Sequence, residues 1–203
     1  MLLTYIKGMG TGAGLIMAIG AQNAFVLSQG VRKNHYIVIP LICAVCDAIL
    51  VTIGVTGVGS MITGNPLFSQ IAGIGGALFL FVYGAGAFKS AIQGNRMDTD
   101  QTAVTSTKAA ILTTLAVTLL NPHVYIDTIL LLGSIASQFQ APEHLVFGAG
   151  AVTASFAWFF ILSIGAGFLA PLFKKQSSWR ILDTCVGIIM WTIGLSVAQG
   201  VLS

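Results

Sequence analysis

The sequence predicts an all-α polytopic membrane protein with six transmembrane helices, and three observations lead to this fold class. Apolar residues occupy 56% of the 203 positions and charged residues only 7%, whereas an average soluble domain has about 25% charged residues. The apolar residues form stretches of roughly 20 or more, each long enough to cross a hydrocarbon core about 30 Å thick. The 24 glycines are typical of membrane helices, because small residues let neighbouring backbones approach closely.

Six apolar segments are bounded by charged or turn residues, and each is predicted to form one membrane helix. They are residues 3–27, 37–62, 67–87, 109–136, 145–173 and 181–202. The chain is therefore predicted to consist of a first three-helix half (1–92), a cytoplasmic central loop (93–108) and a second three-helix half (109–203). Because each half crosses the membrane three times, related halves would be inverted repeats, a recurrent plan among transporters.

The basic residues predict the orientation. Lys and Arg follow the first and fifth segments and surround the central loop, at Arg32, Lys33, Lys89, Arg96, Lys108, Lys174, Lys175 and Arg180. Only Lys7 lies on the opposite side, so the positive-inside rule predicts three cytoplasmic loops and both termini outside. These residues form no basic stripe, and the net charge of +3 therefore does not indicate nucleic-acid binding.

The three cysteines, Cys43, Cys46 and Cys185, all lie within apolar segments. This placement argues against a disulfide scaffold, and no zinc-ligand spacing is completed by nearby His residues. Neither a metal nor a cofactor is predicted. On a helix, Cys43 and Cys46 share one face, which favours packing; a thiol–disulfide carrier is the alternative.

The fourth segment contains a polar interruption. Pro122 removes a backbone donor and clashes with the preceding turn, so the helix is predicted to break near residues 118–122. Freed backbone groups are tolerated within a membrane only where they are buried in protein or line a wet cavity. Asn121, His123 and Tyr125 bring polar side chains to the same place. A binding site is predicted here, and the alternative is a packing kink whose Asn bonds a neighbouring helix.

The first segment contains a second interruption at a corresponding position. Gly20 and Ala21 form a predicted hinge, followed directly by Gln22 and Asn23. Paired interruptions in two halves are the best sequence indication of a binding site at the membrane midplane. The Trp residues, including Trp158, and the many Phe residues are expected to face lipid or fill the bundle.

Two acids, Asp47 and Asp127, are the only ones predicted to lie well inside apolar segments. Asp47 lies on the order of 15 Å from the cytoplasmic end of its segment at 1.5 Å per residue. An ionised carboxylate at such depth costs at least about 2.5–3.5 kcal/mol unless it is paired or faces water. Both are predicted to face a central cavity, attract a cation and take up protons; the alternative is a structural pair or, for Asp127, a place near the outer interface. His123 either titrates near neutral pH or is a hydrogen-bonding spacer.

Three motifs resemble the lysine and arginine exporter family, the LysE type, and are closest to its arginine exporters. They are GAQNAFVL at 20–27 followed by GVR at 30–32, CD at 46–47, and LNPHVYID at 120–127. The resemblance covers essentially the whole chain. It implies export of L-arginine or L-lysine from the bacterial cytoplasm across the inner membrane, driven by protons. The family's important polar positions correspond to Gln22, Asn23, Asp47, Asn121, Pro122 and Asp127; Ala21 stands where the family usually has Pro.

Secondary active export by proton-coupled antiport is the predicted function, and no enzymatic activity is predicted. A cation leaving the cell moves against the membrane potential at about 2.3 kcal/mol per 100 mV, so export needs coupling. The expected partners are a basic amino acid, protons and the lipid bilayer, with monomer and homo-oligomer both open. The alternatives are an exporter of neutral amino acids such as threonine or homoserine, the thiol–disulfide carrier, and a structural membrane subunit. The two intramembrane acids favour a cationic substrate.

Overall fold

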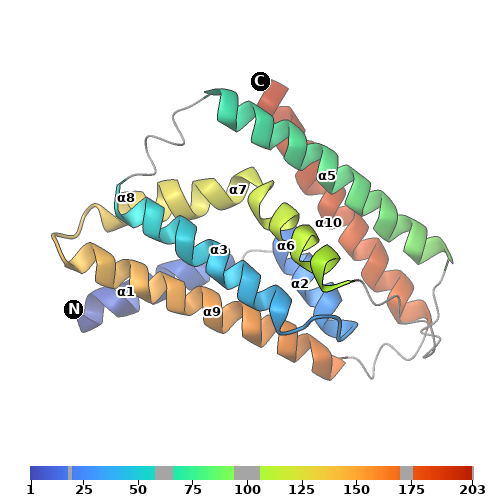
Figure 1. Cartoon of the computed structure of the whole chain (residues 1–203), viewed down its shortest axis with the longest axis horizontal. Helices are drawn as coiled ribbons and strands as arrows, with labels where there is room; N and C mark the ends of the chain where they lie inside the picture. Colours follow the sequence, from blue (N-terminus) through green and yellow to red (C-terminus); the bar gives the residue numbers. More distant parts are fainter. Residues whose placement is uncertain (18–19, 58–65, 94–105, 170–175, 203) are drawn as a thin grey trace.

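The computed structural model describes residues 1–17, 20–57, 66–93, 106–169 and 176–202, and every regular element within them is a helix (Figure 1). The elements are α1 (Leu2–Ile16), α2 (Ala21–Val31), α3 (Val38–Val55), α5 (Pro66–Gln93), α6 (Thr107–Leu119), α7 (Pro122–Tyr125), the π-helical turn η1 (Ile126–Leu131), α8 (Leu132–Ala136), α9 (Glu143–Leu169) and α10 (Gln176–Leu202). The predicted all-α class is confirmed for these residues. The predicted central loop, 93–108, lies outside them except at its two ends.

Helices that can cross a bilayer are present within these ranges. Val38–Val55 and Glu143–Phe168 are each long and apolar enough, and α1 and α2 would add a third span if the pair counts as one. Shorter apolar helical pieces are Ala77–Ile92, Thr107–Leu119 and Ile126–Ala136. The protein is thus a multi-pass membrane protein, while six spans and inverted repeats stay predictions.

The first predicted segment consists of two helices instead of one. Helix α1 ends at Ile16, α2 begins at Ala21, and their axes differ by 82°. Gly20 has an extended backbone, with φ −133° and ψ 176°, directly before α2. The bend therefore lies between Ile16 and Ala21, a range that includes the predicted hinge residue Gly20, and Ala21 itself is fully buried.

The predicted break in the fourth segment lies at residues 120–121, between α6 and α7. Pro122 is the first residue of α7, a position where its missing N–H costs nothing. The Tyr125 hydroxyl donates to the Leu119 carbonyl oxygen at 2.7 Å, which satisfies one carbonyl freed by the break. The chain then widens into η1, and π-helical turns of this kind are frequent at functional sites.

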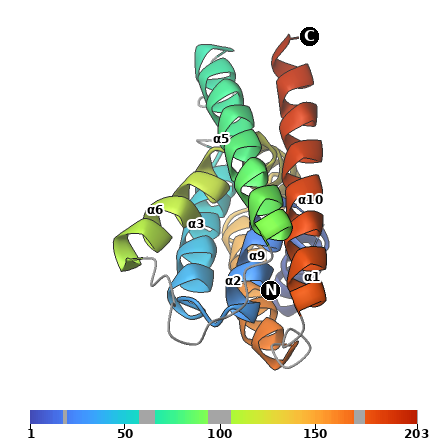
Figure 2. The same ribbon diagram turned by 90° about the vertical axis from the view of Figure 1, so that its right-hand side faces the viewer.

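Helix α9 is the central packing element, because α1, α2 and α3 all contact it. Close approach explains part of the glycine content: a Cβ on Gly8 of α1 would lie 2.0 Å from the Phe147 carbonyl oxygen of α9. Helices α5 and α10 run side by side along most of their length (Figure 2). The group formed by α1, α2, α3 and α9 is joined to the α5–α10 pair through contacts of α2 and α6.

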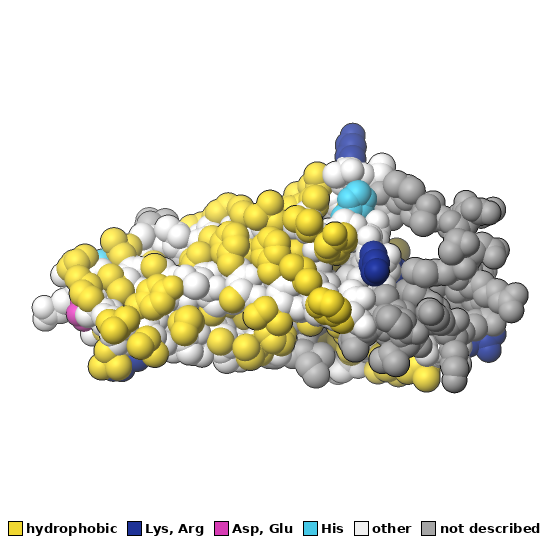
Figure 3. Space-filling view, turned by 90° about the horizontal axis from the view of Figure 1, so that it is seen from below, with side chains coloured by type: hydrophobic (Ala, Val, Ile, Leu, Met, Phe, Trp, Pro, Cys, Tyr) yellow, Lys and Arg dark blue, Asp and Glu magenta, His cyan; other side chains and the backbone are white. Residues whose placement is uncertain are grey.

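The outer surface is largely apolar. A broad band of hydrophobic side chains covers the face shown in Figure 3, with most of the visible Lys and Arg side chains to its right. Large aliphatic residues such as Leu78, Val82 and Ile161 are about two-thirds exposed, at 64%, 66% and 65%. Such a surface suits lipid rather than water, as the composition predicts.

A polar cavity between the two helix breaks

A cavity of about 290 Å³ lies between the two helix breaks. Its walls come from both breaks and from α3, η1, α8 and α10, and are formed by Leu15, Ile16, Gly20, Gln22, Asn23, Asp47, Asn121, Val124, Asp127, Thr128, Leu132 and Ile193. The structure thus brings five of the predicted polar residues to one place, although they are up to 105 positions apart in the chain (Gln22 to Asp127). Most of the remaining lining is aliphatic.

The other predicted site residues are placed differently. The Tyr125 side chain is half-buried and bonds the α6 carbonyl described above instead of lining the cavity. Ala21 is buried in the packing core. The side chains of Pro122 and His123 lie outside the described residues, so the two interpretations of His123 both stay open.

Asp47 has one paired and one unpaired carboxylate oxygen. Its side chain lies at the middle of α3 and the residue is 2% exposed. Oδ2 accepts a hydrogen bond from Ser155 Oγ at 2.7 Å. Oδ1 is buried and has no hydrogen-bond partner among the described residues. Burying an ionised group without compensation is costly, so this oxygen is suited to bind a cation or a proton.

Asp127 supplies a second carboxylate on the same cavity. It lies in the first turn of η1 and is half-buried. The two carboxylates are close enough to interact electrostatically. Since like charges repel in a medium of low dielectric constant, a cation between them is favoured.

The two amides of the first break hold the bend together. Asn23 Nδ2 donates to the Ile16 carbonyl oxygen at 2.7 Å, and Asn23 Oδ1 accepts from Trp158 Nε1 at 3.2 Å. Gln22 Nε2 donates to Thr118 Oγ1 at 3.2 Å, which connects the first break to the helix before the second. The two interruptions, predicted independently, are thus in direct contact.

Comparison with known proteins identifies the family. The model of LysE type translocators matches residues 13–200. The chain belongs to the LysE family. The predicted resemblance is confirmed, and because the family consists of translocators, the protein is a transporter and not an enzyme.

Relatives of this LysE family member are similar over nearly their full lengths. A putative amino-acid transporter, YggA of Aeromonas salmonicida, is 41% identical over 203 residues, which cover 100% of this chain and 98% of the relative. The arginine exporter protein ArgO of Shigella flexneri is 40% identical, and that of Escherichia coli strain K12 is 38% identical, each over 200 residues covering 98% of this chain and 95% of the relative. No solved structure matches the chain significantly.

The LysE family protein also contains contacts to the cavity wall that the sequence analysis did not predict. Thr118, Ser155 and Trp158 each bond a residue of the cavity wall, and Thr128 is part of that wall. Trp158 was expected only to face lipid or fill the bundle. A signal was present, because Ser155 and Trp158 are three residues apart in an apolar segment and so share one helix face.

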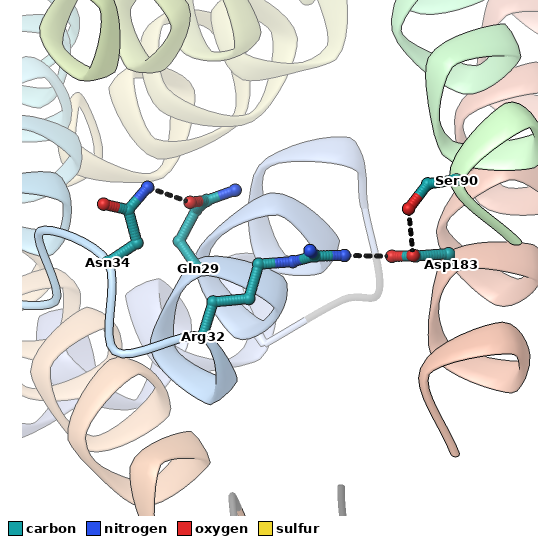
Figure 4. A network of polar contacts seen from close by, with 5 residues as sticks. All are labelled: Gln29, Arg32, Asn34, Ser90 and Asp183. Atoms are coloured by element: carbon teal, nitrogen blue, oxygen red, sulfur yellow. Dashed lines mark hydrogen bonds and ion pairs between the residues drawn. The ribbon is translucent and has the colours of Figure 1, made fainter. Parts of the chain in front are cut away.

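A second buried acid lies near the start of the sixth predicted segment, where the sequence analysis assigned it no role. Asp183 in α10 is 5% exposed. It forms an ion pair with Arg32, and its Oδ2 accepts from Ser90 Oγ at 2.6 Å (Figure 4). Beside this pair, Asn34 Nδ2 donates to Gln29 Oε1 at 2.8 Å. The network connects the end of α2 to α5 and α10, away from the cavity wall.

The cysteines of the LysE family protein are free thiols. Cys43 is fully buried, with its Sγ 3.9 Å from Thr118 Oγ1, and Cys46 is 8% exposed. Neither lines the cavity. Among the described residues no group of three or more metal-ligating side chains occurs. The packing interpretation of Cys43 and Cys46 is therefore favoured over a thiol–disulfide carrier.

Proposed function

We propose that the protein exports basic amino acids, L-arginine first among them, from the bacterial cytoplasm across the inner membrane. The observation that carries this proposal is the buried Oδ1 of Asp47, which has no hydrogen-bond partner among the described residues, in a residue that lines the cavity. The cavity volume of about 290 Å³ is just below the range of small-molecule sites, about 300–1,000 Å³. Two relatives named as arginine exporters support the choice of substrate.

In the proposed site, carboxylates bind the charged side chain of the substrate and side-chain amides bind its α-amino and carboxylate groups. Asp47 Oδ1 accepts the cationic side chain, with Asp127 as the second carboxylate. Gln22 and Asn121 bind the α-amino and carboxylate groups, which suit amide donors and acceptors. Asn23 is already bonded to Ile16 and Trp158, so its contribution is to keep the bend in place beside the substrate.

Proton antiport supplies the driving force. A cation leaving an inside-negative cell must be coupled to another flow, and Asp47 and Asp127 are carboxylates that exchange protons for the substrate. Protonation from outside weakens the attraction for the cation and releases it. The protonated, substrate-free site then returns to the cytoplasmic side, where it loses its proton before the next substrate binds, and this return completes alternating access.

The proposed architecture has six membrane helices in two inverted halves, residues 1–92 and 109–203, joined by the cytoplasmic loop 93–108. Both termini are outside, as the distribution of Lys and Arg favours. The two breaks then occupy equivalent positions, one in each half. Their contact through Gln22 and Thr118 supports one shared site at the midplane.

Efflux from proteoliposomes tests this function. Vesicles containing the purified protein are loaded with labelled arginine, lysine or threonine, and efflux is followed with and without an inwardly directed proton gradient. We expect gradient-stimulated efflux of arginine or lysine and retention of threonine. Efflux of threonine alone would assign the protein to the neutral amino-acid exporters. Arginine efflux that does not depend on the proton gradient would contradict antiport.

A further inference from the structure

Helix α9 donates hydrogen bonds to two polar residues of the cavity wall without lining the cavity itself. Ser155 Oγ donates to Asp47 of α3, and Trp158 Nε1 donates to Asn23 of α2. The two donors are three residues apart, so they project from the same face of α9 about one turn from each other.

The Ser155 hydroxyl departs from the usual behaviour of hydroxyls in apolar helices. Such a group ordinarily donates to the carbonyl four residues earlier, as Thr52, Thr114 and Thr153 do in this protein, at 2.6, 2.7 and 2.8 Å. Ser155 instead donates across to α3, although it is fully buried. Its single proton is thus committed to one oxygen of Asp47.

We propose that Ser155 is a positioning residue for substrate recognition: it holds Asp47 Oδ2, so that Oδ1 of this cavity-lining residue stays unpaired and available to the substrate. This inference rests on the proposed function and names a residue that sets the affinity of that same site. A carboxylate has two equivalent oxygens, and its rotation would exchange them. A hydrogen bond to an ionised acceptor is among the stronger ones, so the bond from Ser155 opposes that rotation.

The position of the Ser155 hydroxyl is itself fixed by its helix. The bond from Trp158 ties α9 to the break at Asn23, and Gly150 of α9 packs so closely on α1 that a Cβ there would lie 2.1 Å from the Tyr5 carbonyl oxygen. Helix α9 therefore cannot slide or rotate without breaking contacts. The cation site is built before the substrate arrives, which reduces the ordering cost of binding.

Loss of this hydrogen bond should weaken binding while leaving the translocation steps intact. We expect Ser155→Ala to raise the KM for arginine about 10- to 100-fold, the range for a hydrogen bond to a charged group. The maximal rate should stay within about 2-fold, because interactions lost equally from bound ground and transition states change KM alone. Ser155→Thr, which keeps the hydroxyl, should restore most of the affinity.

The control lies on the same helix. Ser163 is also buried and donates across helices, to the Tyr36 carbonyl oxygen at 2.8 Å, but it does not contact the cavity wall. Ser163→Ala removes an equivalent bond and should leave the KM near the wild-type value. A purely structural role for Ser155 predicts the same result for both serines.

The experiment measures initial rates of arginine transport against arginine concentration in proteoliposomes for wild type, Ser155→Ala, Ser155→Thr and Ser163→Ala, with thermal unfolding in detergent as a folding check. If Ser155→Ala does not fold, Ser155→Cys keeps the volume with a weak donor and should also raise the KM. If the wild type transports arginine and the folded Ala or Cys variant has the same KM, this inference alone would be overturned. Absence of arginine transport by the wild type would overturn the proposed function and this inference with it.

Discussion

Asp47 and Asp183 are both buried carboxylates in apolar helices, at 2% and 5% exposure, yet their surroundings differ in one respect. Each oxygen of Asp183 has a partner, Arg32 for Oδ1 and Ser90 for Oδ2. Asp47, which lines the cavity, has a partner for Oδ2 only, and its buried Oδ1 has none among the described residues. A fully paired carboxylate holds helices together, whereas a half-paired one retains the capacity to bind a ligand.

The largest effect is expected from Asp47→Asn. The substitution keeps the shape of the side chain but removes the charge that the cationic substrate needs. Arginine efflux should fall more than about 100-fold, in line with the 3–5 kcal/mol cost of removing one partner from a buried charge pair. Efflux from proteoliposomes measures the loss, with protein recovered in the membrane as the folding control; full export by the variant would contradict the comparison.

Asp183→Asn should lower stability and leave transport nearly unchanged, in contrast to Asp47→Asn. Loss of the charged partner of Arg32 and Ser90 is expected to lower stability by about 1.5–3 kcal/mol, as for hydrogen bonds to charged groups. The KM for arginine should change less than about 3-fold, since Asp183 does not line the cavity. Thermal unfolding in detergent and transport kinetics on the same preparation separate the two effects. A KM increase without loss of stability would show that the two acids act alike.

A smaller effect is expected from Trp158→Phe. The ring that fills the bundle is kept, but the donor to Asn23 Oδ1 is lost. A neutral hydrogen bond contributes about 0.5–1.5 kcal/mol, so transport efficiency should fall about 2- to 10-fold. The ratio of maximal rate to KM for arginine measures this. No change would mean that the Asn23 contact to Ile16 alone maintains the bend.

The smallest effect is expected from Cys43→Ala combined with Cys46→Ala. Both thiols lie away from the cavity wall and fill the packing around α3. Arginine efflux by the double variant should stay within about 2-fold of wild type, because the lost packing changes stability more than chemistry. Abolished efflux in a folded double variant would revive a role for the thiols.

Sequence reasoning located the cavity because polarity within an apolar segment is a strong physical signal. Polar or helix-breaking residues interrupt apolar runs that must otherwise be compatible with the membrane interior; they are Pro122, Gln22, Asn23 and Asp47. The structure brings the last three together on the wall of one cavity. The depth of Asp47 could be counted from the helix rise alone.

Other contacts were not predictable in the same way. Asp183 is only two positions inside its predicted segment, so depth did not distinguish it, and its pairing with Arg32 depends on how α2 packs against α10. Ser155 and Trp158 are ordinary residues of an apolar helix until the structure places α3 and α2 against α9. The positions of partners across helices depend on tertiary packing, which the pattern of a single segment does not contain.

A comparison of arginine with citrulline tests the central claim most directly, because the two have nearly the same shape and differ in the charge of the side chain. Competition for arginine uptake into proteoliposomes would be measured for wild type and Asp47→Asn. We predict that citrulline competes far more weakly than arginine in the wild type, and that the variant binds the two equally weakly. An unchanged preference for arginine in Asp47→Asn would contradict the role assigned to the unpaired carboxylate oxygen.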